Sequence, residues 1–125
     1  MPQDYAEAVV WFRKAAEQGD GAGENNLGSM YERGQGVPKD YAQAASWYRK
    51  AADQGDALAQ NNLGLMYEDG RGVAQDYVLA HKWFNLAATQ GLDRAKKARD
   101  ELASKMTPAQ IAEAERLARE WKPTK

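Results

Sequence analysis

The residue types that most often carry out chemistry are sparse in this sequence. It has no cysteine and a single histidine, His81, whose nearest polar candidates along the chain are Asp76 and Asn85. Catalysis and metal binding need several oriented side chains, and no such set accompanies this histidine. The sequence also has no P-loop, no nucleophile elbow and no His-Glu-x-x-His zinc motif. We therefore expect neither an enzyme nor a bound metal or cofactor.

Carboxylates are plentiful, but many of them stand where helices are expected to begin. Aspartates occupy these starts at Asp4, Asp20, Asp40, Asp56 and Asp76. An aspartate at such a position accepts hydrogen bonds from the free N–H groups of the first helical turn. Helix capping therefore accounts for these carboxylates, and we do not assign them to acid–base catalysis.

The charge composition argues against a nucleic acid partner and a membrane span. Seventeen basic and eighteen acidic side chains give the 125 residues a formal charge of −1, whereas nucleic-acid binders are usually strongly basic. The one basic cluster, Arg94, Lys96, Lys97 and Arg99, has acidic neighbours and no interleaved aromatic residue. No run of about 20 apolar residues could cross a membrane. Because no export signal is visible, the compartment, cytoplasmic or periplasmic, stays open.

The aromatic residues reveal an internal repeat of 36 residues. Tyrosine recurs at positions 5, 41 and 77, and tryptophan recurs at positions 11, 47 and 83. Alignment of residues 4–39 with residues 40–75 gives 22 identities in 36 positions. A fixed period of about 20 to 50 residues is typical of solenoids, in which each unit buries its apolar face against its neighbours. We therefore expect these aromatic side chains to lie in the core.

Each period has the pattern of two helices separated by glycine turns. Apolar residues spaced three and four apart predict helices over residues 40–53 and 56–69, with Gly55 ending the first. Gly28 and Gly64 lie inside expected helices, where glycine costs about 1 kcal/mol relative to alanine. We expect a neighbouring helix to approach closely at both glycines.

A terminal helix is predicted over residues 107–121. Thr107 and Gln110 have the spacing of a capping box, and Pro108 stands at the first helical position. We predict an all-α fold, an α/α superhelical solenoid of about seven helices in antiparallel pairs with this helix as its C-terminal cap. It forms a single domain over residues 1–125, with repeat units at about residues 4–39, 40–75 and 76–106.

Three motifs recur at fixed spacing and carry a resemblance to a known family. They are Asn-Leu-Gly-x-Met-Tyr, Gly-x-Gly-Val and Ala-Ala-x-Gln-Gly. Over residues 4–95 the chain resembles the Sel1-like repeat, a relative of the tetratricopeptide repeat, found mainly in bacterial and some eukaryotic assemblies. The resemblance implies a superhelix whose concave groove is an adaptor surface for proteins or peptides. Some members carry a disulfide in each repeat, and this cysteine-free chain departs from them.

The resemblance further implies that the helices with the Leu-Gly motif line the concave groove. We expect Asn25 and Asn61 to be exposed there, because an amide offers a donor and an acceptor to the backbone of an extended peptide. The alternative is that the repeated asparagines form hydrogen bonds between helices. The candidate groove residues are Asn25, Ser29, Glu32, Asn61, Leu65, Glu68, Lys97 and Glu101.

The N-terminal helix leaves a second possibility open. Its apolar residues, which include Tyr5, Val9 and Trp11, have no preceding repeat to cover them. Exposed apolar patches of several hundred Å² usually mark a contact. We therefore expect either a piece of a longer repeat protein or a homo-oligomer formed through this helix. The alternative to an adaptor is thus a structural or self-associating repeat segment with no ligand of its own.

Overall fold

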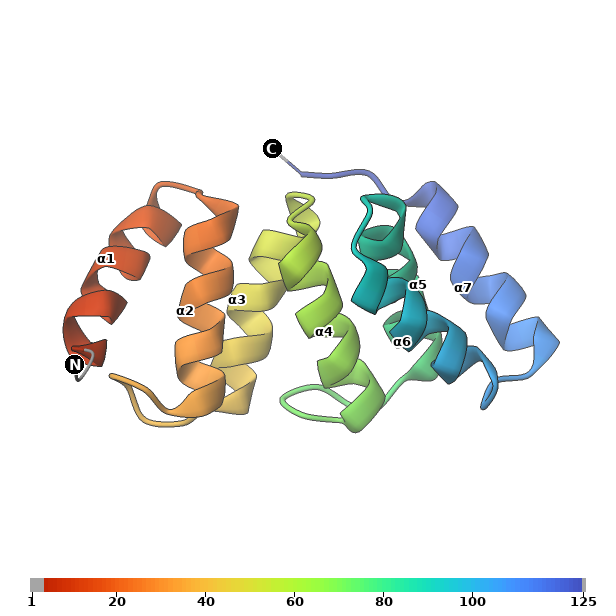
Figure 1. Cartoon of the computed structure of the whole chain (residues 1–125), viewed down its shortest axis with the longest axis horizontal. Helices are drawn as coiled ribbons and strands as arrows, with labels where there is room; N and C mark the ends of the chain where they lie inside the picture. Colours follow the sequence, from red (N-terminus) through yellow and green to blue (C-terminus); the bar gives the residue numbers. More distant parts are fainter. Residues whose placement is uncertain (1–3, 125) are drawn as a thin grey trace.

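Seven helices and no strand make up residues 4–124, the part of the chain that the computed structural model describes. The chain progresses along the long axis from α1 to α7, with α5 and α6 overlapping in this view (Figure 1). They are α1 (Tyr5–Glu17), α2 (Gly21–Arg33), α3 (Tyr41–Asp53), α4 (Ala57–Asp69), α5 (Tyr77–Thr89), α6 (Asp93–Ala103) and α7 (Pro108–Glu120). The predicted all-α solenoid is therefore confirmed.

The helix ends follow from the residues that the sequence places there. The side chains of Asp40 and Asp56 accept hydrogen bonds from the N–H groups three residues ahead, as predicted for helix caps. Gly34 and Gly70 end α2 and α4 in the left-handed conformation, with φ of 67° and 71°. Residues that have a side chain rarely adopt such a φ angle, so these turns favour glycine.

Consecutive helices approach closely at two glycines inside α2 and α4. A Cβ atom added to Gly28 would lie 2.8 Å from the ring of Tyr48, and one added to Gly64 would lie 2.6 Å from the ring of Phe84. Both distances are far below van der Waals contact. The expectation that a neighbouring helix comes close at these glycines is thus correct, and the neighbours are the aromatic rings of α3 and α5.

The repeated tryptophans are buried to different degrees. Trp83 is 1% exposed and Trp47 is half-buried against the first unit, whereas Trp11 is 62% exposed. Trp83 is covered by Trp121, whose ring meets it edge-on with 6.1 Å between ring centroids. The expectation that all repeat aromatics lie in the core is therefore wrong for Trp11, because nothing in residues 4–124 covers the outer side of α1.

Hydrogen bonds between polar side chains also repeat along the solenoid. The Nε2 atom of Gln54 donates to Oε1 of Glu24 at 2.6 Å, and Nε2 of Gln90 donates to Oε1 of Gln60 at 3.0 Å. Each of these bonds joins an even-numbered helix to the end of the following odd-numbered helix. The period of 36 residues therefore repeats polar links as well as apolar packing.

The C-terminal helix caps the solenoid by packing mainly on α5. Thr107 and Gln110 form the predicted capping box, in which each side chain accepts from the backbone N–H of the other. Beyond α7 the chain runs back over the molecule, and the N–H of Thr124 donates to the carbonyl oxygen of Asp53 at 2.7 Å. This tail links the cap to the end of α3.

We predict that Gly64→Ala destabilises the protein although alanine is the better helix former. The new methyl group would overlap the Phe84 ring, and such overpacking costs about 1 to 3 kcal/mol, so after the gain of about 1 kcal/mol in helix propensity we expect a net loss of up to about 2 kcal/mol. The free energy of unfolding, measured by urea denaturation, should fall accordingly.

Gly21→Ala is the matched control. Its Cβ would lie 3.5 Å from Cβ of Asp56, an ordinary contact, and alanine already stands at the equivalent Ala57. This variant should be as stable as the wild type or more stable by up to about 1 kcal/mol. Equal losses in both variants would contradict the proposed role of Gly64.

Candidate binding face

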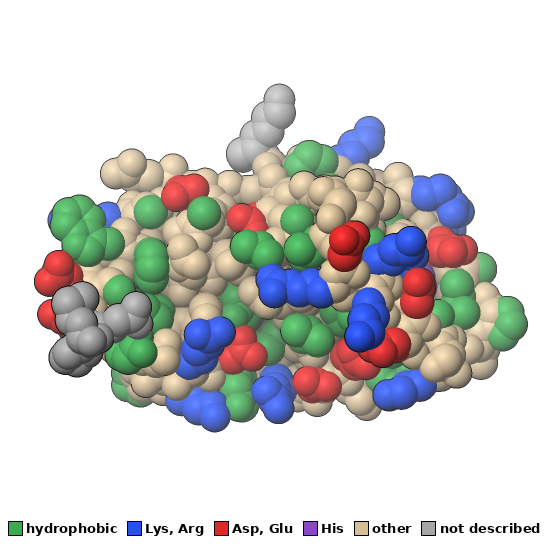
Figure 2. Space-filling model, in the orientation of Figure 1, with side chains coloured by type: hydrophobic (Ala, Val, Ile, Leu, Met, Phe, Trp, Pro, Cys, Tyr) green, Lys and Arg blue, Asp and Glu red, His purple; other side chains and the backbone are tan. Residues whose placement is uncertain are grey.

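The eight predicted groove residues all lie on α2, α4 and α6. These helices lie nearer to the viewer than α3 and α5 in Figure 1, and we call their shared outer surface the α2–α4–α6 face. Positively and negatively charged side chains are intermingled on the surface seen in Figure 2. No large patch of one charge forms there, which agrees with the small net charge of the chain.

The two asparagines predicted to be exposed are buried instead. Asn25 is 8% exposed and Asn61 is 5% exposed. The Nδ2 atom of Asn62 donates to Oδ1 of Asn25 at 2.9 Å, so this pair forms a hydrogen bond between α2 and α4. The expected exposure of Asn25 and Asn61 is therefore wrong, and for Asn25 the alternative role, a hydrogen bond between helices, is the one observed.

Asn61 lacks the bond that Asn25 makes. By the 36-residue period, Ala98 on α6 stands where Asn62 stands on α4, and alanine offers no donor. Among the described residues, Oδ1 of Asn61 is buried with no hydrogen-bond partner. The hydrogen bond between asparagines that joins α2 to α4 is therefore not repeated between α4 and α6.

Glu32 and Glu68, which occupy equivalent positions on α2 and α4, differ in the same way. The hydroxyl of Tyr48 donates to Oε1 of Glu32 at 2.6 Å, whereas the equivalent of Tyr48 in the next unit is Phe84, which has no hydroxyl. Burial raises the pKa of Glu68, and the neighbouring Asp69 raises it further. Of the two carboxylates, that of Glu68 makes no such hydrogen bond and is the one available to a binding partner.

The exposed part of the face has an apolar centre. Leu58 and Leu65 on α4 are 43% and 41% exposed, although leucine usually lies inside a protein. Ser29 occupies the position of Leu65 on α2 and is partly exposed, and Glu101 occupies it on α6 and is exposed. One position on the three helices thus presents a hydroxyl, an apolar side chain and a carboxylate in turn.

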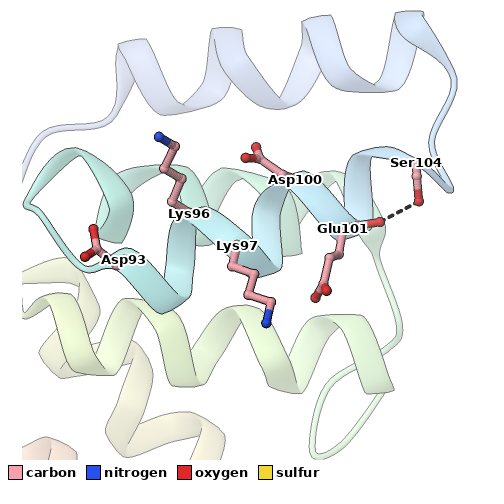
Figure 3. Close-up of a pocket in the computed structure, with 6 residues that line it drawn as sticks. All are labelled: Asp93, Lys96, Lys97, Asp100, Glu101 and Ser104. Carbon is pink, nitrogen blue, oxygen red and sulfur yellow. Dashed lines mark hydrogen bonds between the residues drawn. The ribbon is translucent and has the colours of Figure 1, made fainter.

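A charged hollow lies along α6. Its volume is about 710 Å³, and its lining residues are Asp93, Lys96, Lys97, Asp100, Glu101 and Ser104. Figure 3 shows Lys97 and Glu101 pointing toward α4, whereas Lys96 and Asp100 point toward α7. Sequence reasoning selected two of these six residues and missed the others, because α6 departs from the repeat pattern that guided the selection.

His81, the one histidine, lies between helices and has no partner suited to catalysis. It is 3% exposed, and its Nδ1 atom makes no hydrogen bond within the described residues. Burial lowers the pKa of His81, and Arg99 lowers it further, while Glu115 and Asp100 act in the opposite direction. In residues 4–124 no three His, Cys, Asp or Glu side chains gather as metal ligands would. None of the described helices is long and apolar enough to span a membrane.

Comparison of the sequence with models of protein families shows to which family this solenoid belongs. The Sel1 repeat model matches residues 1–20, 21–56 and 57–92. The chain belongs to the Sel1 repeat family. In this division each complete Sel1 repeat begins with a Leu-Gly helix and continues through the following aromatic helix.

Two solved structures resemble the chain closely. One is c5321, a protective antigen of uropathogenic Escherichia coli with an SLR fold, at 41% identity and a TM-score of 0.92. The other is a Sel1 repeat protein from Oxalobacter formigenes, at 37% identity and a TM-score of 0.75. They cover 97% and 79% of this chain, which spans only 27% and 41% of theirs. No match was found among curated proteins.

Membership of the Sel1 repeat family gives a general functional class. Sel1 repeat proteins are generally scaffolds for protein interactions, and the fold is typically not enzymatic.

The asparagine pair generates a prediction about stability. Asn25→Ala removes a hydrogen bond between repeats and leaves the Asn62 amide unpaired, so it should lower the free energy of unfolding by about 1 kcal/mol. Asn61→Ala removes a buried acceptor without a partner and improves helix propensity, so it should leave stability unchanged or raise it. Urea denaturation of both variants measures the difference, and equal losses would show that the two asparagines have equivalent partners.

His81 generates a prediction about pH. The lowered pKa keeps His81 neutral in the folded chain. In the unfolded chain the imidazole has its ordinary pKa of about 6.5 and takes up a proton as the pH falls through that value. Acidification below about pH 6.5 therefore favours unfolding. The advantage in unfolding free energy of the wild type over His81→Gln should shrink between about pH 7.5 and pH 5, as followed by urea denaturation at several pH values. A constant difference would contradict the neutral state of His81.

Proposed function

We propose that this Sel1 repeat segment binds a protein segment, either a peptide or a helix, in a concave groove formed by the α2–α4–α6 face. The observation that carries the proposal is the pair of exposed leucines on α4, Leu58 and Leu65, which lie on the same α2–α4–α6 face as the charged hollow of α6. Protein interfaces commonly combine an apolar centre with a polar rim.

The spacing of the leucines favours a regular partner. They lie seven residues apart on α4, which corresponds to about 10 Å along a helix. Apolar side chains seven residues apart on a partner helix, or three apart on a peptide in the polyproline II conformation, would match this distance. Covering each leucine would contribute about 1 kcal/mol, so the two together provide an anchor of modest strength.

The charged side chains would then select the partner. Lys97 and Glu101 on α6 point toward α4, the helix that carries the two leucines (Figure 3). A partner with an acidic and a basic residue beside its apolar anchor would pair with both. Charge matching of this kind contributes more to specificity and to the rate of association than to affinity. Glu68, whose carboxylate has no tyrosine partner, adds an acceptor on the same side.

A second candidate is self-association through α1, and the exposure of Val10 and Trp11 favours it. They are 51% and 62% exposed, whereas the equivalent Trp47 and Trp83 pack against the preceding unit. A second copy, or another Sel1 repeat, would cover this surface in the same way. The segment would then be structural, with no ligand of its own.

We predict that the double variant Leu58→Ser and Leu65→Ser loses binding partners without unfolding. Both leucines are partly exposed, and the first unit already has a small side chain at each equivalent position, Ala22 and Ser29, so the fold should be retained. Chemical crosslinking in a lysate, followed by mass spectrometry and by direct titration of each captured protein, should show at least a tenfold loss of affinity.

Val10→Ser provides the matched control, because it makes the same type of change at a similarly exposed site outside the groove, where the next unit has Ser46. It should keep the partners of the wild type. If the captured proteins bind the double leucine variant as tightly as the wild type, the proposed groove is wrong. Light scattering that shows concentration-dependent assembly, lost in Val10→Ser, would instead support the structural role.

A further inference from the structure

The first and third units link their paired helices by a hydrogen bond from one equivalent position, whereas the middle unit does not. In the first unit, Nη2 of Arg13 on α1 donates to the hydroxyl of Tyr31 on α2 at 3.0 Å. In the third unit, Asn85 on α5 occupies the position of Arg13, and its Oδ1 accepts from Nη1 of Arg99 on α6 at 2.7 Å. In both units a hydrogen bond therefore joins the aromatic helix to the helix that follows it.

In the middle unit this link between helices is missing. Arg49 occupies the position of Arg13, but its Nε atom donates to Asp53, one turn further along α3, at 3.2 Å. Tyr67 on α4 occupies the position of Tyr31, and no hydrogen bond joins it to Arg49 among those of the described residues. A guanidinium and a phenol that are paired in the first unit are thus unpaired with each other here.

A cavity of about 270 Å³ lies between these two groups, and both line it. Its apolar wall includes Ala45, Leu63 and Val73. Two of the lining positions have smaller side chains than in the first unit. Val9 and Val10 of the first unit are replaced by Ala45 and Ser46.

Arg49 is the one charged side chain among the residues that line the cavity, and its positive charge favours an anion. The guanidinium of Arg49 lies 5.9 Å from the ring centroid of Trp83, and the ammonium of Lys82 lies 4.4 Å from it. Burial lowers the pKa of Lys82, and the neighbouring charge of Arg49 lowers it further. Lys82 and Asp53 are not among the lining residues, and Asp53 pairs with Nε of Arg49, so the terminal nitrogens of Arg49 are the positive groups left for an anion.

We propose that this cavity binds a small carboxylate with a short apolar body. The carboxylate bridges the terminal nitrogens of Arg49 and the hydroxyl of Tyr67, and so replaces the link that the other units make directly. Guanidinium and carboxylate groups match in geometry, which makes this pairing strong. The body packs against Ala45, Leu63 and Val73. Drug-sized ligands need about 300 to 1,000 Å³, so the cavity suits a body of a few carbon atoms.

Two sources can supply such a carboxylate, namely a free branched-chain acid and the C-terminus of a peptide that ends in a small apolar residue. The probes are isovalerate, acetyl-glycyl-valine with a free C-terminus, and the same dipeptide as its amide. Each is titrated into the whole ¹⁵N-labelled chain, and amide chemical shifts are recorded. At least one free carboxylate should give saturable shifts in residues 42–49 and 63–73, whereas the amide should give none.

Two variants test the site itself. Tyr67→Phe should weaken binding at least tenfold, and the matched change in the first unit, Tyr31→Phe, should leave it unaltered. The double variant Ala45→Val and Ser46→Val recreates the side chains of the first unit and should abolish binding. Saturation by isovalerate identifies a free acid as sufficient, and saturation by the dipeptide alone identifies a peptide terminus. The proposal is overturned if no probe saturates, if the amide binds equally well, or if Tyr67→Phe and Tyr31→Phe behave alike.

Discussion

The contact between a helix glycine and an aromatic ring is the constraint on which the solenoid depends. The ring of Tyr48 lies over Gly28, and the ring of Phe84 lies over Gly64, in each case where a Cβ atom would stand. On α6, which follows α2 and α4 in the repeat, Asp100 stands where α2 and α4 have this glycine. A side chain there prevents the next helix from approaching α6 in the same way, which is consistent with α7 packing mainly on α5. Loss of one glycine therefore changes how the solenoid ends.

Most of the fold could be predicted because its determinants are local and repeated. Aspartate caps, glycine turns and apolar spacing act within a few residues, and the period of 36 residues presents each of them more than once. The contact of Trp83 with Trp121 and the bond from Thr124 to Asp53 could not be foreseen in the same way. They join segments that no repeat relates, so the sequence pattern contains no signal for them.

The candidate site was less predictable, since its properties depend on single substitutions that break the repeat. Adjacent asparagines 25 and 26 differ by about 100° around the helix, and both units repeat the pair, so the pattern does not say which is buried. The structure distinguishes them through Asn62, which bonds to Asn25. Replacement of this donor by Ala98, and of Tyr48 by Phe84, then gives chemically similar residues different partners in successive units.

The C-terminal tail makes this solenoid behave differently from a simple stack. In a stack, each unit senses only its neighbours, so the ends can fray independently and unfolding can spread from either side. Here the bond from Thr124 to Asp53 spans 71 residues and bypasses the third unit. Opening the cap therefore also loosens the end of α3, and the C-terminal half should open as one cooperative block while α1 opens separately. Hydrogen exchange would thus divide the chain along a boundary that the sequence repeats do not mark.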